Sequence, residues 1–400
     1  MDDKRIFGLR RNVFFLGLVS LFNDFSAEMV YSVMPAFLTT VLGAPPIFIG
    51  FMEGFVDALA SALKVFSGWL SDKIGRRKIF AVSGYALSVA TRSVLALVGN
   101  FWQVFVLRIV DRVGKGFRDA PRDALLSESV ASGELGRSFG YHRAMDTAGA
   151  ILGPLGALLL LPLLNNDYRQ LFFVAFGLGL LAIVTFFFVR EVKTREEICP
   201  TVPIAFTFSL RNFSHSFRLF LVAMFLFGLG VMPVSLMLLK ANDVGLPIAA
   251  IPALYLMYTI SFALFAVPFG RASDAIGEKR VIVFGFCAGI VAYGLLAFAA
   301  NALTVTFGFI CFGLYSAMTD GVSRAFVTKL VPHEQLAQGQ GFLQSAIGIS
   351  SLFGGVVGGG IWTVYGAFFA FSYGVVLMLL GTIVFVRLNG LHRAGMKNEE

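Results

Sequence analysis

The stretch GWLSDKIGRRK, residues 68–78, returns in altered form as GRASDAIGEKR, residues 270–280. A glycine, a serine, an aspartate, an isoleucine and a second glycine recur in the same order and at the same spacing. The two copies stand about half of the 400-residue chain apart, and Arg122 and Arg324 repeat at the same distance. This repeat indicates that the chain consists of two similar halves.

The composition places the chain in a lipid bilayer. It is 57% apolar and 14% charged, with 44 phenylalanines and a mean hydropathy of +0.80. Soluble domains carry roughly 25% charged residues, and a soluble fold has too little interior for this much apolar surface. Long apolar runs between short polar breaks predict membrane-spanning helices, and the period-two alternation of barrel strands is not found.

A helix of about 20 apolar residues crosses a bilayer, and the sequence predicts twelve such spans. They are placed at residues 12–40, 46–70, 79–98, 101–118, 139–163, 168–189, 217–239, 248–270, 281–300, 302–324, 341–363 and 367–387. We therefore predict an all-α membrane protein with twelve transmembrane helices in two pseudo-symmetric six-helix halves. The halves are residues 1–189 and 217–400, the second with a short cytoplasmic tail, and a polar cytoplasmic linker at 190–216 joins them.

Lysine and arginine gather on one side of this arrangement. If the N-terminus lies inside, most of the 32 lysines and arginines fall in segments that face the cytoplasm. Such an excess predicts that both termini are cytoplasmic. The placement also accounts for the net charge of +8 without a nucleic-acid partner, because scattered cations suit anionic lipid. We expect a monomeric, multi-pass protein of the cell inner membrane.

Residues 68–78 resemble the loop 2–3 signature of the major facilitator superfamily, and residues 270–280 resemble its second copy, with departures at Ala275 and Glu278. Twelve spans, cytoplasmic termini and a central loop extend the resemblance over the whole chain. It implies transport by alternating access, with these loops acting as a cytoplasmic latch. The gating residues that it implies are Gly68, Asp72, Gly75, Arg76 and Arg77, and in the second copy Gly270, Asp274 and Gly277.

Two further stretches are similar to signatures of this superfamily. LRIVDR places Arg108 where the family has its intramembrane arginine, although Asp111 and Arg112 replace the usual glutamine and glycine. GAILGPLGAL resembles the span 5 signature of drug exporters through Gly149, Gly153 and Pro154. DRVGKGFRDAPRDALLSES resembles a prokaryotic branch whose substrates are mostly unassigned. The span 5 signature implies export.

Ionisable residues interrupt the spans of the first half, and in a bilayer such residues mark a transport pathway or ion pairs. Asp24 and Glu28, like Glu53 and Asp57, are four residues apart, so each pair shares one helix face. We predict that these four acids converge with arginines near mid-membrane and hold exchangeable protons. The candidate cavity residues are Asn23, Asp24, Glu28, Glu53, Asp57, Arg108, Asp111 and Asp320.

Other intramembrane residues receive different predictions. Arg92 is a weaker candidate because span 3 is usually peripheral in this superfamily, and Asp146, near His142, is expected to be structural. The cavity of the second half is expected to be polar and aromatic. Its residues are Tyr255, Tyr258, Tyr315, Thr319 and Gln344.

These observations predict a secondary active transporter that exports a small solute in exchange for protons. A metabolite uptake symporter shares the same fold, and a divalent-metal exporter is a further alternative because Asn23, Asp24 and Glu28 offer hard oxygen ligands. A non-transporting membrane protein or an enzyme is a more distant alternative, because no catalytic grouping or extramembrane domain stands out. We expect no cofactor and no bound structural metal, and as partners the lipid bilayer, a small solute and protons.

Overall fold

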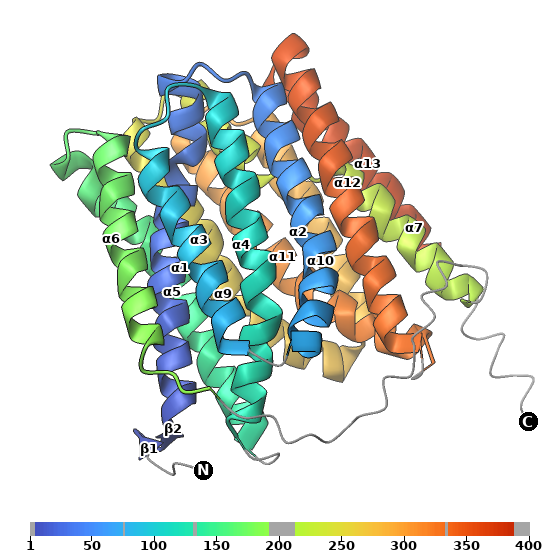
Figure 1. Ribbon diagram of the computed structural model, residues 1–400. Coiled ribbons are helices and arrows are strands. Elements are labelled where there is room, and N and C mark those ends of the chain that lie inside the picture. Colours follow the sequence, from blue (N-terminus) through green and yellow to red (C-terminus); the bar gives the residue numbers. More distant parts are fainter. Residues whose placement is uncertain (1–4, 75–76, 131–133, 192–212, 333–334, 388–400) are drawn as a thin grey trace, which may run out of the picture. The chain divides into compact units, whose positions relative to one another are not determined.

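The computed structural model describes residues 5–74, 77–130, 134–191, 213–332 and 335–387, without the side chains of 61–74, Ala120, Ile248 and Ala337. Twelve long helical segments follow one another in this part (Figure 1). They are α1 (Arg11–Ala36, continued by the π-helix η1, Phe37–Val41), α2 (Pro46–Ile74), α3 (Arg77–Leu95), α4 (Phe101–Glu128), α5 (Leu135–Leu163), α6 (Tyr168–Phe186), α7 with α8 (His215–Gly230, Val234–Asp243), α9 (Ile251–Ile276), α10 (Glu278–Ala297), α11 (Ala302–Leu330), α12 (Leu336–Tyr365) and α13 (Ala367–Arg387).

The segments confirm the predicted all-α membrane fold. Nine helices in the described part of the chain are long and apolar enough to cross a bilayer. The most polar segment is α4, which carries charged side chains along its length and continues ten residues beyond its predicted end at Arg118, through Pro121, to Glu128. Its last turns extend the helix with polar sequence that hydropathy alone does not assign to a span.

The chain divides into two compact units, and α2 and α9 contribute to both. Unit 1 is Met1–Ala44, Leu59–Thr201 and Pro247–Leu256, and unit 2 is Pro45–Ala58, Val202–Leu246 and Met257–Glu400. The predicted division at residues 190–216 stays a prediction, because most of that linker lies outside the described residues. Each unit is described separately below.

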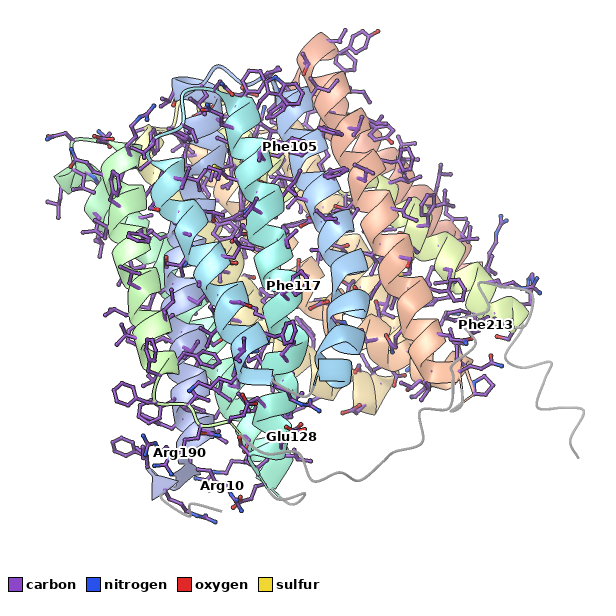
Figure 2. The ribbon with its side chains drawn as sticks, in the orientation of Figure 1. Arg10, Phe105, Phe117, Glu128, Arg190 and Phe213 are labelled. Carbon is purple, nitrogen blue, oxygen red and sulfur yellow. The ribbon has the colours of Figure 1, made fainter. Side chains whose placement is uncertain are left out.

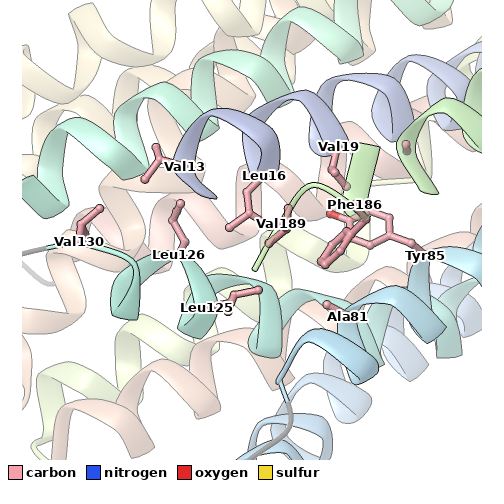
Figure 3. Close-up of a cluster of buried hydrophobic side chains, with 11 residues drawn as sticks. Val13, Leu16, Val19, Ala81, Tyr85, Leu125, Leu126, Val130, Phe186 and Val189 are labelled. Atoms are coloured by element: carbon pink, nitrogen blue, oxygen red, sulfur yellow. The ribbon is translucent and has the colours of Figure 1, made fainter. Parts of the chain in front are cut away.

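In unit 1, α1 packs along α5 and α6, and α3 packs along α4 and α6. Near the start of α1, a buried apolar cluster joins four helices (Figure 3). Leu16 and Val19 of α1 meet Tyr85 of α3, Leu125 of α4 and Phe186 of α6 there, all almost fully buried. With no hydrophobic force acting between helices in lipid, this close fit and the polar contacts described below hold the unit together.

A short hairpin that the sequence did not predict precedes α1. Strands β1 (Arg5–Ile6) and β2 (Leu9–Arg10) pair antiparallel around Phe7 and Gly8, both of which have positive φ. Arg5 and Arg10 each form an ion pair with Glu134, at 2.9 and 3.0 Å. The hydrogen bond from Arg10, together with the two positive charges, lowers the pKa of the Glu134 carboxyl below its usual value.

The hairpin lies at the same end of unit 1 as the residues that follow α4 and α6. Asn12 donates to Ser129 and to the carbonyl of Arg190, and its own carbonyl accepts the Arg190 amide. Figure 2 shows Arg10, Glu128 and Arg190 together at this end, whereas Phe105, near the start of α4, lies toward the opposite end of that helix. The N-terminal hairpin, the end of α4 and the chain after α6 are therefore on one side of the unit.

In unit 2, α10 packs along α11 and α13, and α7 packs along α12 and α13. The span made by α7 and α8 is broken at Val231–Pro233, where a proline cannot donate a backbone hydrogen bond. The Tyr293 hydroxyl bridges the break, accepting from the Met232 amide at 2.6 Å and donating to its carbonyl at 3.3 Å. A buried backbone break in a membrane needs such a partner.

An ion pair joins two consecutive helices at corresponding places in both units. In unit 1, Arg77 begins α3 and contacts Glu128 at the end of α4, at 2.8 Å. In unit 2, Glu278 begins α10 and contacts Lys329 near the end of α11, at 2.6 Å. The members of each pair are 51 residues apart in the chain, but their charges are reversed between the units.

Candidate functional site

The two acids of α1 lie against two glycines of α5. A Cβ placed on Gly149 would come within 3.0 Å of the Asp24 Cβ and 2.6 Å of a backbone oxygen of α1. One placed on Gly153 would come within 2.6 Å of the Glu28 Cβ. Both pairs are spaced i,i+4, so glycine stands opposite acid on two successive turns. The glycines predicted from the span 5 signature thus let α5 approach the α1 backbone where the acids are; Pro154 is buried beside them.

Asp24 lies between cations and a further acid. Its carboxylate accepts from the Asn23 amide at 2.9 Å and lies 4.0 Å from the Arg118 guanidinium of α4. Lys115, one turn earlier on α4, and Asp146 of α5 are also within electrostatic reach. The Asp24 side chain is 27% exposed, so it is largely but not fully buried. An acid in this setting can exchange a proton as the nearby cations move.

One face of α4 carries a row of charged residues, and two of them, Lys115 and Arg118, act on Asp24. Arg108 lies 4.0 Å from Asp111 and over the Tyr31 ring at 5.3 Å, and Arg118 lies over the Tyr85 ring at 4.6 Å. The predicted cavity residues included Arg108 and Asp111 but not Lys115 or Arg118. The spacing of Arg108, Asp111, Lys115 and Arg118 by three or four residues was the signal that would have placed all of them on one face.

Glu28 has an aromatic partner that the sequence assigned elsewhere. The Tyr255 hydroxyl donates to the Glu28 carboxylate at 2.8 Å, and the Tyr255 ring packs edge-on against Tyr31. The prediction that Tyr255 lines the cavity of the second half is therefore corrected: in the structure it belongs to unit 1. It lies near the beginning of the long α9 helix, whose residues up to Leu256 belong to unit 1.

Arg92 is more central than its position in span 3 suggested. Its guanidinium is 3% exposed and donates to Ser26 at 2.7 Å and to the Asn23 carbonyl at 2.9 Å. Ser26 in turn donates to the carbonyl of Ala175 on α6. Arg92 thus ties α3 to α1 and, through Ser26, to α6, by way of neutral hydrogen-bond acceptors.

Asp146 occupies a buried polar cluster close to the same acid. It accepts a hydrogen bond from Ser20, and one of its oxygens lies 3.5 Å from the His142 Nδ1. These contacts join the early part of α1 to α5. The structural role expected for Asp146 stays a prediction.

Unit 2 contains a cavity of about 310 Å³. Tyr258, Tyr315, Thr319 and Gln344 line it, as expected for the second half, together with Phe227, which stacks on the Tyr315 ring at 5.4 Å. The walls are therefore aromatic and hydroxyl-bearing, which is typical of sites for small organic molecules.

Asp320 and Arg324 lie on the same cavity wall and pair with one another at 2.8 Å. Both side chains are about half exposed. The predicted cavity residue Asp320 thus belongs to the cavity of unit 2.

The remaining predicted residues are placed as follows. Glu53, 1% exposed, and Asp57 lie in the part of α2 that belongs to unit 2, so the convergence of all four acids stays a prediction. Gly270 and the exposed Asp274 lie near the end of α9, and Gly277, with a φ of +95°, makes the turn into α10. Of the gating residues predicted in the first copy, only Arg77 has a described side chain. Gly68, Asp72, Gly75 and Arg76 lie outside the residues whose side chains are described.

Among the described residues, no group of three or more histidines, cysteines, aspartates or glutamates could hold a metal ion. The oxygens proposed as metal ligands also have other partners. The Asn23 carbonyl accepts from Arg92, and Glu28 accepts from Tyr255. A metal at this place would have to displace an arginine.

The profile of the Major Facilitator Superfamily matches residues 16–252 and 219–399. The chain belongs to the Major Facilitator Superfamily. An uncharacterised MFS-type transporter of Methanocaldococcus jannaschii is 32% identical over 383 residues, which cover 94% of each chain. The class G tetracycline resistance protein of Vibrio anguillarum is 25% identical over 352 residues, covering 82% of this chain and 84% of that one.

Solved structures of the superfamily share the fold. The crystal structure of a mutant of the nucleoside transporter NupG matches with a TM-score of 0.78 and 15% identity, covering 94% of this chain and 99% of that one. As a superfamily member the chain is a multi-pass membrane transport protein rather than an enzyme. The paired acid–glycine turns of α1 and α5 and the aromatic cavity of unit 2 are its candidate functional sites.

Proposed function

We propose that this superfamily member exports a small organic solute in exchange for protons, by alternating access, and that Asp24 and Glu28 carry the exchanged protons. The observation that carries the proposal is the setting of Asp24, a partly exposed carboxylate 4.0 Å from the Arg118 guanidinium. Intramembrane acids of this kind mark proton pathways in transporters. The aromatic cavity of unit 2 is the proposed site of solute contact.

The direction of transport rests on two weaker supports. Gly149, Gly153 and Pro154 match the signature of drug exporters, and a relative is named for tetracycline resistance. We propose that both termini are cytoplasmic. In unit 1 the N-terminal hairpin, the end of α4 and the chain after α6 meet on one side, and their basic residues meet there too.

Proteoliposomes containing a pH-sensitive dye test the coupling. Candidate solutes are added outside, tetracycline first, followed by a panel of aromatic cations and Mn²⁺. Exchange predicts that entry of the solute drives protons out of the lumen, whereas symport predicts that protons enter with it. Asp24→Asn and Glu28→Gln are expected to stop proton movement. Asp243→Asn, at the end of α8, is the matched control and is expected to behave as the wild type.

The outcomes separate the alternatives. Solute movement without proton movement, at the same rate in Asp24→Asn as in the wild type, would refute proton coupling. Proton entry with the solute would instead establish an uptake symporter. Movement of Mn²⁺ that depends on Asp24 would favour the metal exporter.

A further inference from the structure

A chain of two hydrogen bonds leads from a fully buried arginine to the proposed proton-carrying acid. The Arg92 Nη2 donates to the Asn23 Oδ1 at 2.9 Å, and the Asn23 Nδ2 donates to the Asp24 Oδ1 at 2.9 Å. Asn23 is fully buried, and Arg92 is 3% exposed. The Asn23 amide is therefore polarised at one end by a positive charge and bonded at its other end to the carboxylate.

The fold makes room for this arginine. Gly179 of α6 stands where a Cβ would come within 2.8 Å of the Arg92 Nη1, so any larger residue would displace the guanidinium. Ser26 holds the same nitrogen at 2.7 Å and is itself fixed to the Ala175 carbonyl. The guanidinium is thus held in one orientation, with its second nitrogen directed at Asn23.

A positive charge in this place is expensive, because a buried arginine loses its hydration and here donates to neutral oxygens; the acid that attracts it most, Asp111 of α4, acts on it electrostatically. A neutral side chain with the same donors would join α3 to α1 at a lower cost. What the charge adds is an effect on its surroundings. A donor amide polarised by a cation forms a stronger hydrogen bond to an ionised carboxylate than to a neutral one.

We propose that Arg92 is a positioning residue for proton coupling: through Asn23 it favours the ionised form of Asp24, so that the acid releases its proton. The inference rests on the proposed function, since it assumes that Asp24 is the proton carrier. Arg92, a residue of α3, would thus influence proton release although it touches neither Asp24 nor the cavity of unit 2. Arg118 then acts on Asp24 directly from α4, and Arg92 acts on it from α3 through Asn23.

Other charged and titratable groups face Asp24 as well, and the experiment must separate them from Arg92. They are Arg118 and Lys115 of α4, Asp146 and His142 of α5, Tyr85 of α3 and Glu28 of α1. All of them stay in place when Arg92 is changed. Two hydrogen bonds and an amide in series put the two charges about 7–8 Å apart.

Infrared titration of the purified protein in detergent measures the effect without a substrate. The carboxylic-acid C=O band of Asp24 is the band that disappears in Asp24→Asn, and its midpoint is followed between about pH 5 and pH 9. In Arg92→Gln we expect the midpoint to move to higher pH, by on the order of one pH unit. Arg92→Lys keeps the charge and is expected to recover most of the shift.

Two further variants complete the design. Asn23→Ala interrupts the chain from the other end and is expected to raise the midpoint as well, which keeps the proposal testable if Arg92→Gln does not fold. Arg169→Gln is the matched control. It removes an arginine that also joins α6 to α3, through the carbonyls of Ala96 and Val98 at 2.8 Å, and it should leave the midpoint unchanged.

The two possible failures have different signatures. If Asp24 titrates in the wild type but its midpoint is the same in Arg92→Gln and Asn23→Ala, Arg92 is only a structural tie and the inference is wrong, while Asp24 remains a proton carrier. If the wild-type band shows no titration over the whole range, Asp24 carries no proton, and both the proposed function and this inference fall.

Discussion

The ion pairs Arg77–Glu128 and Glu278–Lys329 join the same two helix ends in each unit with opposite polarity, one residue out of register with the repeat, and this leads to two predictions of opposite sign. A helix carries about half a positive charge at its N-terminus and half a negative charge at its C-terminus. Glu278 begins α10 and Lys329 lies in the last turn of α11, so both charges suit their helix ends. Arg77 begins α3 and Glu128 ends α4, so both oppose them.

The size of the effect follows from this placement. One charge at a helix end is worth about 0.3–1 kcal/mol, with the sign set by the end. Exchanging the partners of a pair keeps their mutual attraction but reverses two such terms, each from one sign to the other. The double variant Arg77→Glu/Glu128→Arg should therefore gain about 1–4 kcal/mol in unfolding free energy, and Glu278→Lys/Lys329→Glu should lose a similar amount.

Unfolding in mixed detergent micelles, followed by helical circular dichroism at low ionic strength, measures both variants against the wild type. Raising the salt concentration should shrink the two differences together, because these pairs are partly exposed. If both exchanges change stability in the same direction, the polarity of the pairs has nothing to do with the helix ends and the reasoning is refuted.

Three further changes test other parts of the structure. Gly153→Ala would place a Cβ 2.6 Å from the Glu28 side chain, so we expect a loss of about 1–3 kcal/mol in unfolding free energy and impaired transport. The same change at Gly136, which has nothing within 4 Å, should be neutral. An unchanged melting temperature of Gly153→Ala would argue against the close approach of α1 and α5. Tyr293→Phe leaves the backbone break of the span formed by α7 and α8 without its partner and should cost about 1–3 kcal/mol, measured by thermal unfolding. Glu134 has a lowered pKa, so its ion pairs contribute stability above the ordinary carboxyl pKa of 4.5 and lose it as the pH falls through the lower folded value. The protection of the N-terminal hairpin against hydrogen exchange, relative to the intrinsic amide rate at each pH, should therefore fall on acidification, and Glu134→Gln should lower it in the same way at neutral pH.

The sequence was sufficient to predict the helical membrane fold because long apolar runs and the repeated loop signature are local features of the chain. It also placed Asp24 and Glu28 on one face of α1, because the i,i+4 spacing fixes this within any helix. Tyr258 and Tyr315 were correctly expected in the cavity of the second half.

The sequence could not predict which side chains of different helices contact one another. Nothing in the spacing of Tyr255 indicates that its hydroxyl bonds to Glu28, because this depends on where α9 begins relative to α1. Arg92 was undervalued for a similar reason: the neutral residues that receive its hydrogen bonds, Asn23 and Ser26, carry no charge signal in the sequence. The polar continuation of α4 was missed because hydropathy stops at the membrane boundary, whereas the helix does not.

The glycine contacts between α1 and α5 have a mechanical consequence. At Gly149 and Gly153 the backbones of α1 and α5 are in direct contact, so neither helix can slide or rotate against the other without a steric clash. The two helices therefore move as one rigid body. On the α4 side of Asp24 the contact is made by Arg118, a long side chain with several rotatable bonds, at 4.0 Å. A change in the Arg118 side-chain rotamer would therefore open the α4 side of Asp24, while the backbone contacts keep its α5 side closed.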